Sequence, residues 1–116
     1  MIPIESLRKL ALSFPETYEE PHFEKTSFRV KKKIFVTYYA QTNTAVIKLS
    51  EVLQHVFSAA DPASVYPVNN KWGKQGWTTI AMNTVNPDLF ADAITTAYCE
   101  VAPTDLAKQV RPAENT

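Results

Sequence analysis

The sequence has little of several features that identify a protein class directly. Its 116 residues include two glycines and one cysteine, and the formal net charge is zero. A single cysteine, Cys99, excludes an internal disulfide and a zinc site with four thiolate ligands. No run approaches the roughly 18 apolar residues of a membrane span, and the first residues lack a signal-peptide pattern. We therefore expect a cytoplasmic protein without a membrane partner.

The composition that is present fits one globular domain. Apolar residues make up 45% of the chain and charged residues 21%, which is close to the average of folded domains. The length allows one hydrophobic core and is too short for two ordinary domains. We place the domain at residues 1–103 and a C-terminal tail at residues 104–116.

The zero net charge hides an uneven distribution along the chain. Between Lys25 and Lys74 there are eight basic residues and two acidic ones, a net charge of +6, so the flanks together carry −6. No acidic residue lies between Lys25 and Lys48. Such asymmetry is more informative than the total, and it keeps nucleic acid among the possible partners.

Hydrophobic periodicity predicts an α+β fold with the element order α-β-β-β-α-β-α. Helical spacing and capping residues indicate three helices, and alternating or β-branched runs indicate four strands. Strands joined by hairpins between helices are typical of a two-layer sandwich, with the helices on one face of an antiparallel sheet. The expected helices cover residues 4–13, 51–60 and a segment starting at Asn86, and the expected strands cover 26–30, 34–39, 45–49 and 77–82.

Several details accompany this assignment. Residues 15–25 are interpreted as a polar connection, and residues 61–76 as a long connection. The helix over 51–60 is expected to start at the N-cap Ser50 and the last helix at Asn86-Pro87-Asp88. A weak helical turn near Leu106 and Val110 precedes a tail that frays. We expect the buried face of the 51–60 helix to consist of Val52, Leu53, Val56 and Phe57.

Three adjacent lysines are predicted to form the turn of the first hairpin. Lys31, Lys32 and Lys33 would project into solvent there as a small wing suited to phosphate contacts. The alternative interpretation is a solubilising turn or a device that protects a sheet edge.

A second candidate is the segment from Asn69 to Trp77, which contains both glycines and both tryptophans. Glycine permits positive φ or a close approach to a partner, and tryptophan stacks on a base or anchors a surface. Alternatively, the tryptophans close the end of the core while the glycines form a turn. Because Trp77 opens an apolar strand, we expect it in the core.

The polar connection holds a third candidate, an acidic cluster. Carboxylates there could bind a hard cation, and a histidine could join a transition-metal site. However, the chain has no EF-hand loop and no His-x-x-x-His pair, so a structural role is the alternative for each histidine. The residues concerned are Glu16, Glu19, Glu20, His22 and Glu24, with His55 elsewhere in the chain.

The sequence offers no set of catalytic residues. It contains no Gly-x-Ser-x-Gly elbow, phosphate-binding glycine-rich loop or dinucleotide fingerprint. Cys99 lies near the end of the last helix beside Tyr98, where we expect it to be inert and partly buried.

Taken in order, these segments resemble the MmcQ/YjbR family of small bacterial proteins over roughly residues 4–102. No single motif is catalytic, and the resemblance depends on the order and spacing of the segments. They are Leu10–Thr17, Pro21–Phe23, Phe28–Val30, Lys33–Phe35, Val46–Leu49, Tyr66–Thr79 and Ala97-Tyr98.

The resemblance implies a fold like that of CyaY and frataxin, with two helices packed on one face of an antiparallel sheet. It also implies DNA binding by analogy with a double-wing domain, although a fold alone does not fix function. The family's lysine in the Asn-Lys-Trp segment corresponds to Lys71 beside Trp72, and the lysine ending the third strand corresponds to Lys48. Many relatives have a glycine-containing turn where this chain has Lys31–Lys33. Iron handling is not carried over, because the first helix has only one acid, Glu5.

Our sequence-based hypothesis is a DNA-binding protein with DNA as its partner, without a cofactor, a metal or enzymatic activity. We expect a monomer, although the sequence does not fix the oligomeric state. The alternatives are a small-ligand or protein-interaction module at the Trp72/Gly73 loop, a metal-handling protein using Glu16–Glu24, and an enzyme of unrecognised type. The predicted DNA-binding residues are Arg29, Lys31, Lys32, Lys33, Lys48, Lys71 and Lys74 on phosphates, with Asn70 and Trp72 reaching a base or sugar.

Overall fold

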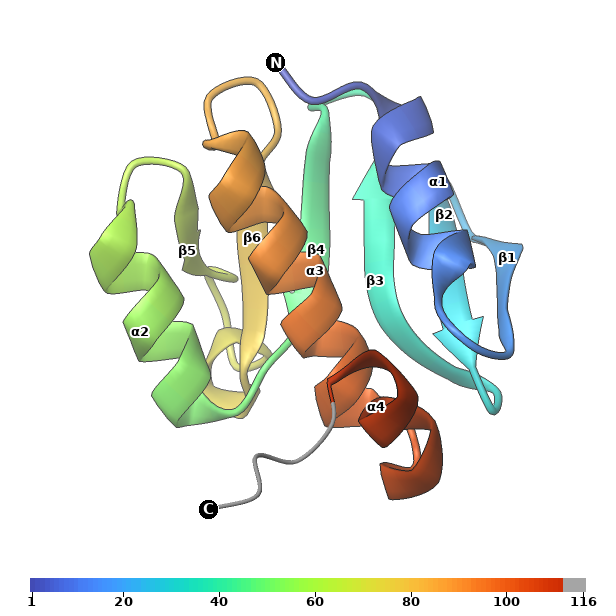
Figure 1. Cartoon of the computed structure of the whole chain (residues 1–116). Helices are drawn as coiled ribbons and strands as arrows, with labels where there is room; N and C mark the ends of the chain where they lie inside the picture. Colours follow the sequence, from blue (N-terminus) through green and yellow to red (C-terminus); the bar gives the residue numbers. More distant parts are fainter. Residues whose placement is uncertain (112–116) are drawn as a thin grey trace.

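A computed structural model of the protein describes residues 1–111. Its centre is one six-stranded sheet with the strand order β1-β2-β3-β4-β6-β5, in which every neighbouring pair is antiparallel (Figure 1). Four consecutive strands form a meander, and β6 then pairs with β4 so that β5 becomes the second edge. The strands are β1 (Thr17–His22), β2 (Lys25–Val30), β3 (Lys33–Tyr39), β4 (Thr44–Lys48), β5 (Val65–Pro67) and β6 (Trp77–Ala81).

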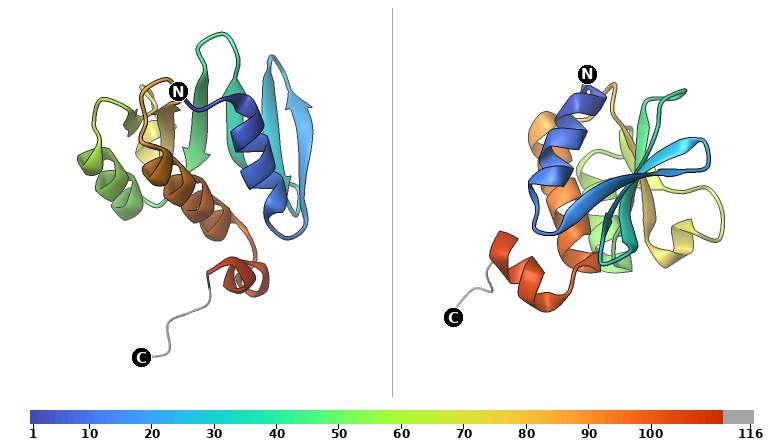
Figure 2. Two further views of the ribbon diagram at one scale, coloured as in Figure 1. Left: turned by 45° about the horizontal axis from the view of Figure 1, so that its top comes forward. Right: turned by 90° about the vertical axis from the view of Figure 1, so that its right-hand side faces the viewer.

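The long helices all cover the same face of this sheet. In Figures 1 and 2, α3 crosses the middle of the sheet, α1 lies beside it over the β1–β3 side, and α2 lies toward β5. We call the opposite face of the sheet the open face. Within residues 1–111, the only helix on this side is the 3-10 helix η1 (Gly73–Gln75), which lies in the loop before β6. The predicted α+β class is therefore confirmed. The α-helices are α1 (Ile4–Ser13), α2 (Glu51–Ala60), α3 (Pro87–Val101) and α4 (Thr104–Val110).

Three aromatic rings occupy the centre of the core between the sheet and the helices. The ring centroid of Tyr98 on α3 lies 4.7 Å from that of Phe14 and 5.4 Å from that of Phe35 on β3. The Tyr98 hydroxyl donates a hydrogen bond of 2.8 Å to the Pro15 carbonyl. This bond gives the buried polar end of Tyr98 a partner and joins α3 to the chain just after α1.

Both predicted helix starts are confirmed. The Ser50 hydroxyl accepts a hydrogen bond of 3.1 Å from the Leu53 backbone N–H, and the Asn86 side chain accepts bonds from two N–H groups of α3. These side chains satisfy donors that have no partner within the helix. Pro87 occupies the first turn of α3, where its missing N–H costs nothing.

Two strands were missed in the sequence, because neither shows the alternation of a half-buried strand. The segment 17–22, which the sequence predicts as part of a polar connection, pairs with β2 over its whole length as β1. It is an edge strand rich in charge and contains Pro21, which an edge tolerates because no neighbour needs its N–H. The other, β5, has only three residues, and they belong to the predicted long connection.

The expected buried face of α2 is wrong in part. Phe57 is buried and Leu53 is partly buried, but Val52 and Val56 are 73% and 55% exposed. His55 is exposed as well, so it is not a core histidine. The reason is that α2 lies over the short β5 edge, where less sheet is available to cover its apolar side chains.

Near the C-terminus, the predicted weak helical turn is the seven-residue helix α4. Leu106 of α4 is buried in the core and Val110 packs against it. The predicted fraying of the tail falls on residues 112–116, which lie outside the described residues. None of the helices in residues 1–111 combines the length and apolar character needed to cross a bilayer.

Candidate nucleic-acid interface

The pairing of the strands decides which side chains reach the open face. Successive side chains of a strand point to opposite faces. On β2, Phe28 and Val30 are buried under the helices, which leaves Arg29 on the open face. On β4, Ile47 is buried in the same way, and Lys48 faces the other side. Two predicted DNA-binding cations therefore share this face.

A cavity of about 680 Å³ lies where the β2–β3 hairpin, the end of β4 and the end of α3 meet. Four of the predicted cations line it, and Glu100 is the acid among its lining residues. We call it the basic cavity. Its lining includes Arg29, Lys32, Lys33, Ile34, Lys48, Trp77 and Glu100.

A second cavity, of about 330 Å³, lies over the middle of the open face. Its floor is formed by side chains of β3 and β4, and its walls by the β1–β2 hairpin on one side and the loop before β6 on the other. Figure 2 (right) shows this hairpin and this loop projecting from the sheet on the side away from the helices. We call it the aromatic cavity. It is lined by His22, Lys25, Ile34, Thr37, Val46, Val68, Asn70, Trp72 and Trp77.

The loop that carries Trp72 is held by its own Asn70 side chain and by α2. The Asn70 side-chain oxygen accepts a hydrogen bond of 2.8 Å from the Trp72 N–H. Gln54 of α2 donates to the Gly73 carbonyl at 2.9 Å. A Cβ on Gly73 would lie 2.0 Å from the Val68 carbonyl oxygen, so only glycine fits here. The glycine approaches the chain's own backbone and not a partner.

Lys48 secures the other end of this loop. Its Nζ donates to the carbonyls of Gln75 at 2.6 Å and of Leu49 at 3.2 Å. The adjacent Gly76 has a φ of 100°, and a Cβ there would lie 1.7 Å from the Leu49 carbonyl oxygen. Lys48 thus lines the basic cavity and also positions the loop, so its ammonium group is not wholly available to a ligand.

Two further predicted cations have partners within the protein. Lys31 forms an ion pair with Glu16 at 2.8 Å, and this carboxylate raises the pKa of Lys31. Arg29 donates from Nε to the Ser27 hydroxyl at 2.9 Å and lies 3.7 Å from the Glu20 carboxylate. Lys31 does not line the basic cavity, although its neighbours Lys32 and Lys33 do.

The remaining predicted residues lie on the loop before β6. The Nζ of Lys71 lies 5.5 Å from the centroid of the Trp72 ring, a cation–π distance. Lys74 is exposed and lines a small depression together with Asn70 and Gly73. The nine predicted residues are therefore divided between two adjoining cavities and their surroundings.

Sequence reasoning missed most of the aromatic cavity. Trp77 was expected in the core, but it is only partly buried and lines both cavities, because Thr78 and Ile80 take the helix-facing positions of β6. Ile34 also lines both cavities. The alternation of side chains along a strand could have identified Ile34 and Trp77, because each lies next to a residue whose side chain faces the helices.

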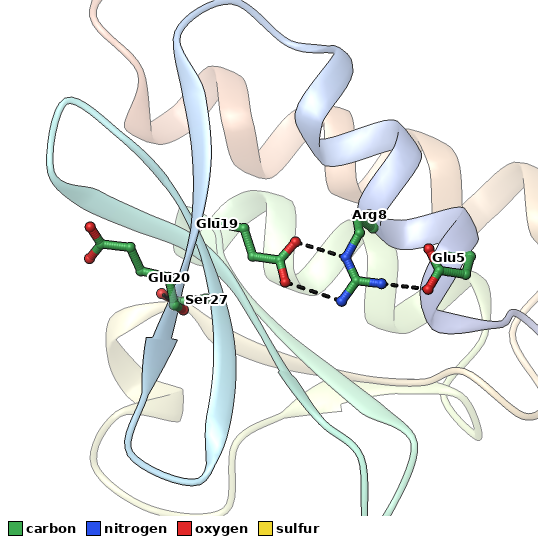
Figure 3. Close-up of polar contacts among 5 residues, drawn as sticks. All are labelled: Glu5, Arg8, Glu19, Glu20 and Ser27. Carbon is green, nitrogen blue, oxygen red and sulfur yellow. Dashed lines mark hydrogen bonds and ion pairs between the residues drawn. The ribbon is translucent and has the colours of Figure 1, made fainter.

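The acidic side chains between Glu16 and Glu24 do not gather at one site, because β1 directs neighbouring side chains to opposite faces of the sheet. Figure 3 shows Glu19 turned toward Arg8 of α1, which it meets at 2.8 Å, and Glu20 on the other side of β1. Arg8 also contacts Glu5, and its pKa is raised, because both carboxylates stabilise its charged form. Within residues 1–111 no three metal-ligating side chains come together. The geometry gives the metal-handling alternative no support.

Cys99 lacks the surroundings of a reactive thiol. It lies partly buried on α3, and its sulfur is 3.9 Å from the Ala107 carbonyl oxygen, to which the thiol donates. Burial raises the pKa of Cys99, whereas a nucleophilic cysteine needs a lowered pKa. The predicted partial burial is confirmed.

The fold and the open face define a small α+β protein with a one-sided helical layer and a group of cations at one end of the sheet. The family model of YjbR matches residues 12–100, and the chain belongs to the YjbR family. The structure is similar to the crystal structure of the Deinococcus radiodurans protein DR2400, which carries the domain DUF419. The TM-score is 0.77 at 20% identity, over 95% of this chain and 88% of that chain. This likeness shows the fold alone. No curated protein matches the chain.

Proposed function

We propose that the protein binds DNA through its open face, with the phosphate backbone held at the basic cavity. The observation that carries the proposal is that Arg29, Lys32, Lys33 and Lys48 line one cavity, next to a cavity lined by two tryptophans. Cations from β2, the β2–β3 hairpin and β4 converge there, although the chain as a whole is neutral. Phosphate contacts of this kind supply affinity that does not depend on sequence.

The ion pairs within the protein limit the number of phosphate contacts. Lys31 is paired with Glu16, and Lys48 is bonded to backbone carbonyls. Counting the other cations on or near the open face, we expect about four to six contacts and a log–log salt slope of about −4 to −5 on duplex DNA. The contributing residues are Lys25, Arg29, Lys32, Lys33, Lys71 and Lys74.

The test is a fluorescence-anisotropy titration of labelled duplex DNA at several salt concentrations. Replacing both Lys32 and Lys33 by Ala should weaken binding and reduce the magnitude of the salt slope by about 2, because each lost contact removes about 0.9. The matched control replaces Lys9 of α1 and Lys108 of α4, two exposed lysines of the helical layer, by Ala. The control has the same charge change and should leave binding nearly unchanged. Absence of binding at low salt, or an equal effect of both double variants, would refute the proposal.

The aromatic cavity favours a second candidate, a module that binds a small ligand or a protein segment beside the Trp72/Gly73 loop. Its volume of about 330 Å³ lies at the lower end of the range of ligand pockets, and much of its lining is apolar. Binding of an uncharged ligand would be insensitive both to salt and to the Lys32/Lys33 double replacement. If only the second candidate holds, the labelled duplex does not bind at low salt, and the same titration therefore distinguishes the two candidates.

A further inference from the structure

The basic cavity, which lies at the end of the sheet beside α3, adjoins the aromatic cavity of the open face. Ile34 and Trp77 line both, so a ligand that extends from one into the other passes over these two side chains. The basic cavity supplies cations and the aromatic cavity supplies rings. This pairing suits a chain in which phosphates alternate with flat apolar groups.

Trp72 is presented for contact and is not packed away. The residue is 49% exposed, although the backbone around it is fixed by a hydrogen bond to Asn70 and by the Gln54 bond to Gly73. A large aromatic side chain on a rigid loop loses little conformational freedom when it stacks on a partner. Every base has a flat face, so a platform of this kind accepts bases with little regard to sequence.

The walls of the aromatic cavity determine which form of nucleic acid reaches it. His22 and Lys25 of the β1–β2 hairpin line one side, and Asn70 and Trp72 of the loop line the other, above a floor that includes Val46. In a duplex the faces of the bases are covered by their neighbours in the stack, and the phosphates form the outer surface. Only a base that has left the stack brings its face to Trp72 or Trp77.

We infer that the open face and the adjoining basic cavity bind single-stranded DNA in preference to duplex, with phosphates at Arg29, Lys32 and Lys33 and an unstacked base in the aromatic cavity. The inference rests on the proposed function and narrows its substrate to one form of DNA. Trp72 and Trp77 form the stacking platform, and Lys25 and Lys71 border it.

The experiment compares three ligands of equal length: an oligo-dT strand, the same strand with abasic positions, and a duplex. Each is titrated against the full chain at low salt. The wild type should bind oligo-dT more tightly than either of the others. Replacement of Trp72 by Ala should weaken oligo-dT binding by about 5- to 150-fold, which corresponds to the roughly 1 to 3 kcal/mol of one stacked base.

The abasic strand isolates the role of the ring. For Trp72→Ala the difference between oligo-dT and the abasic strand should shrink, because the variant lacks the ring on which the base stacks. Trp72→Phe should restore most of that difference, and thermal unfolding of each variant establishes that it is folded. The Lys32/Lys33 double replacement should weaken binding of all three ligands.

The outcomes separate the inference from the proposed function. If no ligand binds at low salt, both fail. If the duplex binds as tightly as oligo-dT, or if Trp72→Ala weakens all three ligands equally, the inference fails while DNA binding stands.

Discussion

The turn between β2 and β3 places lysine in a backbone conformation that favours glycine. Val30 pairs with Lys33, so Lys31 and Lys32 form a two-residue hairpin loop, and their φ angles are 50° and 68°. Positive φ at both central residues is the pattern of a type I′ turn, in which Asn-Gly is preferred. The first hairpin therefore has a strained turn at the edge of the basic cavity, and Lys33 belongs to β3 and not to the turn as predicted.

We predict that Lys32→Gly stabilises the protein. A non-glycine residue in the left-handed region costs about 1 to 2 kcal/mol, and glycine loses about 0.5 to 1 kcal/mol more backbone entropy on folding. The net gain is about 0.5 to 1 kcal/mol, or a rise in Tm of about 2 to 6 °C for a domain of this size. Lys32 is exposed and makes no ion pair within residues 1–111, so little else is lost.

The matched variant is Lys32→Ala, which removes the same charge but keeps a Cβ. Urea and thermal denaturation should place Lys32→Gly above Lys32→Ala by about 0.5 to 1 kcal/mol, whereas both should weaken DNA binding to the same extent. Equal stability of the two variants would refute the strain argument. Higher stability with weaker binding would indicate that the lysine is kept for function at a cost in stability.

Two further predictions concern the loop and the core. Gly73→Ala should destabilise the protein by about 2 kcal/mol or more in urea denaturation, because its Cβ would lie 2.0 Å from the Val68 carbonyl oxygen; an unchanged midpoint would show that the loop shifts freely. Burial raises the pKa of Tyr98 above its ordinary value of 10.0, so the folded state retains this proton when the unfolded chain loses it. The resulting contribution to stability is complete below about pH 10 and is lost as the pH rises through the folded pKa. In denaturation curves measured from pH 8 to 12, the free energy of unfolding of Tyr98→Phe should be about 1 kcal/mol below that of the wild type at the lower end, because the variant lacks the hydrogen bond to Pro15. With rising pH it should then fall less steeply than that of the wild type. Identical slopes would contradict this reasoning.

Much of the secondary structure could be predicted because its causes are local. The apolar spacing of residues 4–13, the N-caps Ser50 and Asn86, and the alternation of β2 are all short-range features, and the structure confirms each. The edge strand β1 was missed for the opposite reason. Its side chains Glu19 and Glu20 find their cationic partners on α1 and β2, so the evidence for this strand lies outside its own segment.

The candidate site was predicted only in part, because proximity in sequence does not decide proximity in space. Lys31 and Lys32 are neighbours, yet the first pairs with Glu16 and the second lines the basic cavity. Lys48 was expected on phosphate, and the structure shows it bonded to the carbonyl of Gln75, 27 residues away.

By itself the sequence determined the α+β class, the principal helices and the segments that carry cations and tryptophans, since hydrophobic period, capping and composition act over a few residues. Only the tertiary structure decided which of those residues meet. Because Trp77 is more apolar than Thr78, the local sequence pattern predicts that Trp77, and not Thr78, faces the core. In the folded sheet Gln54 of α2 bonds the Thr78 hydroxyl at 3.1 Å, Ile80 packs beneath the helices, and strand parity then places Trp77 on the open face. The side of the sheet that a strand buries is set by the helices and strands packed against it, and this placed Trp77 beside the cations.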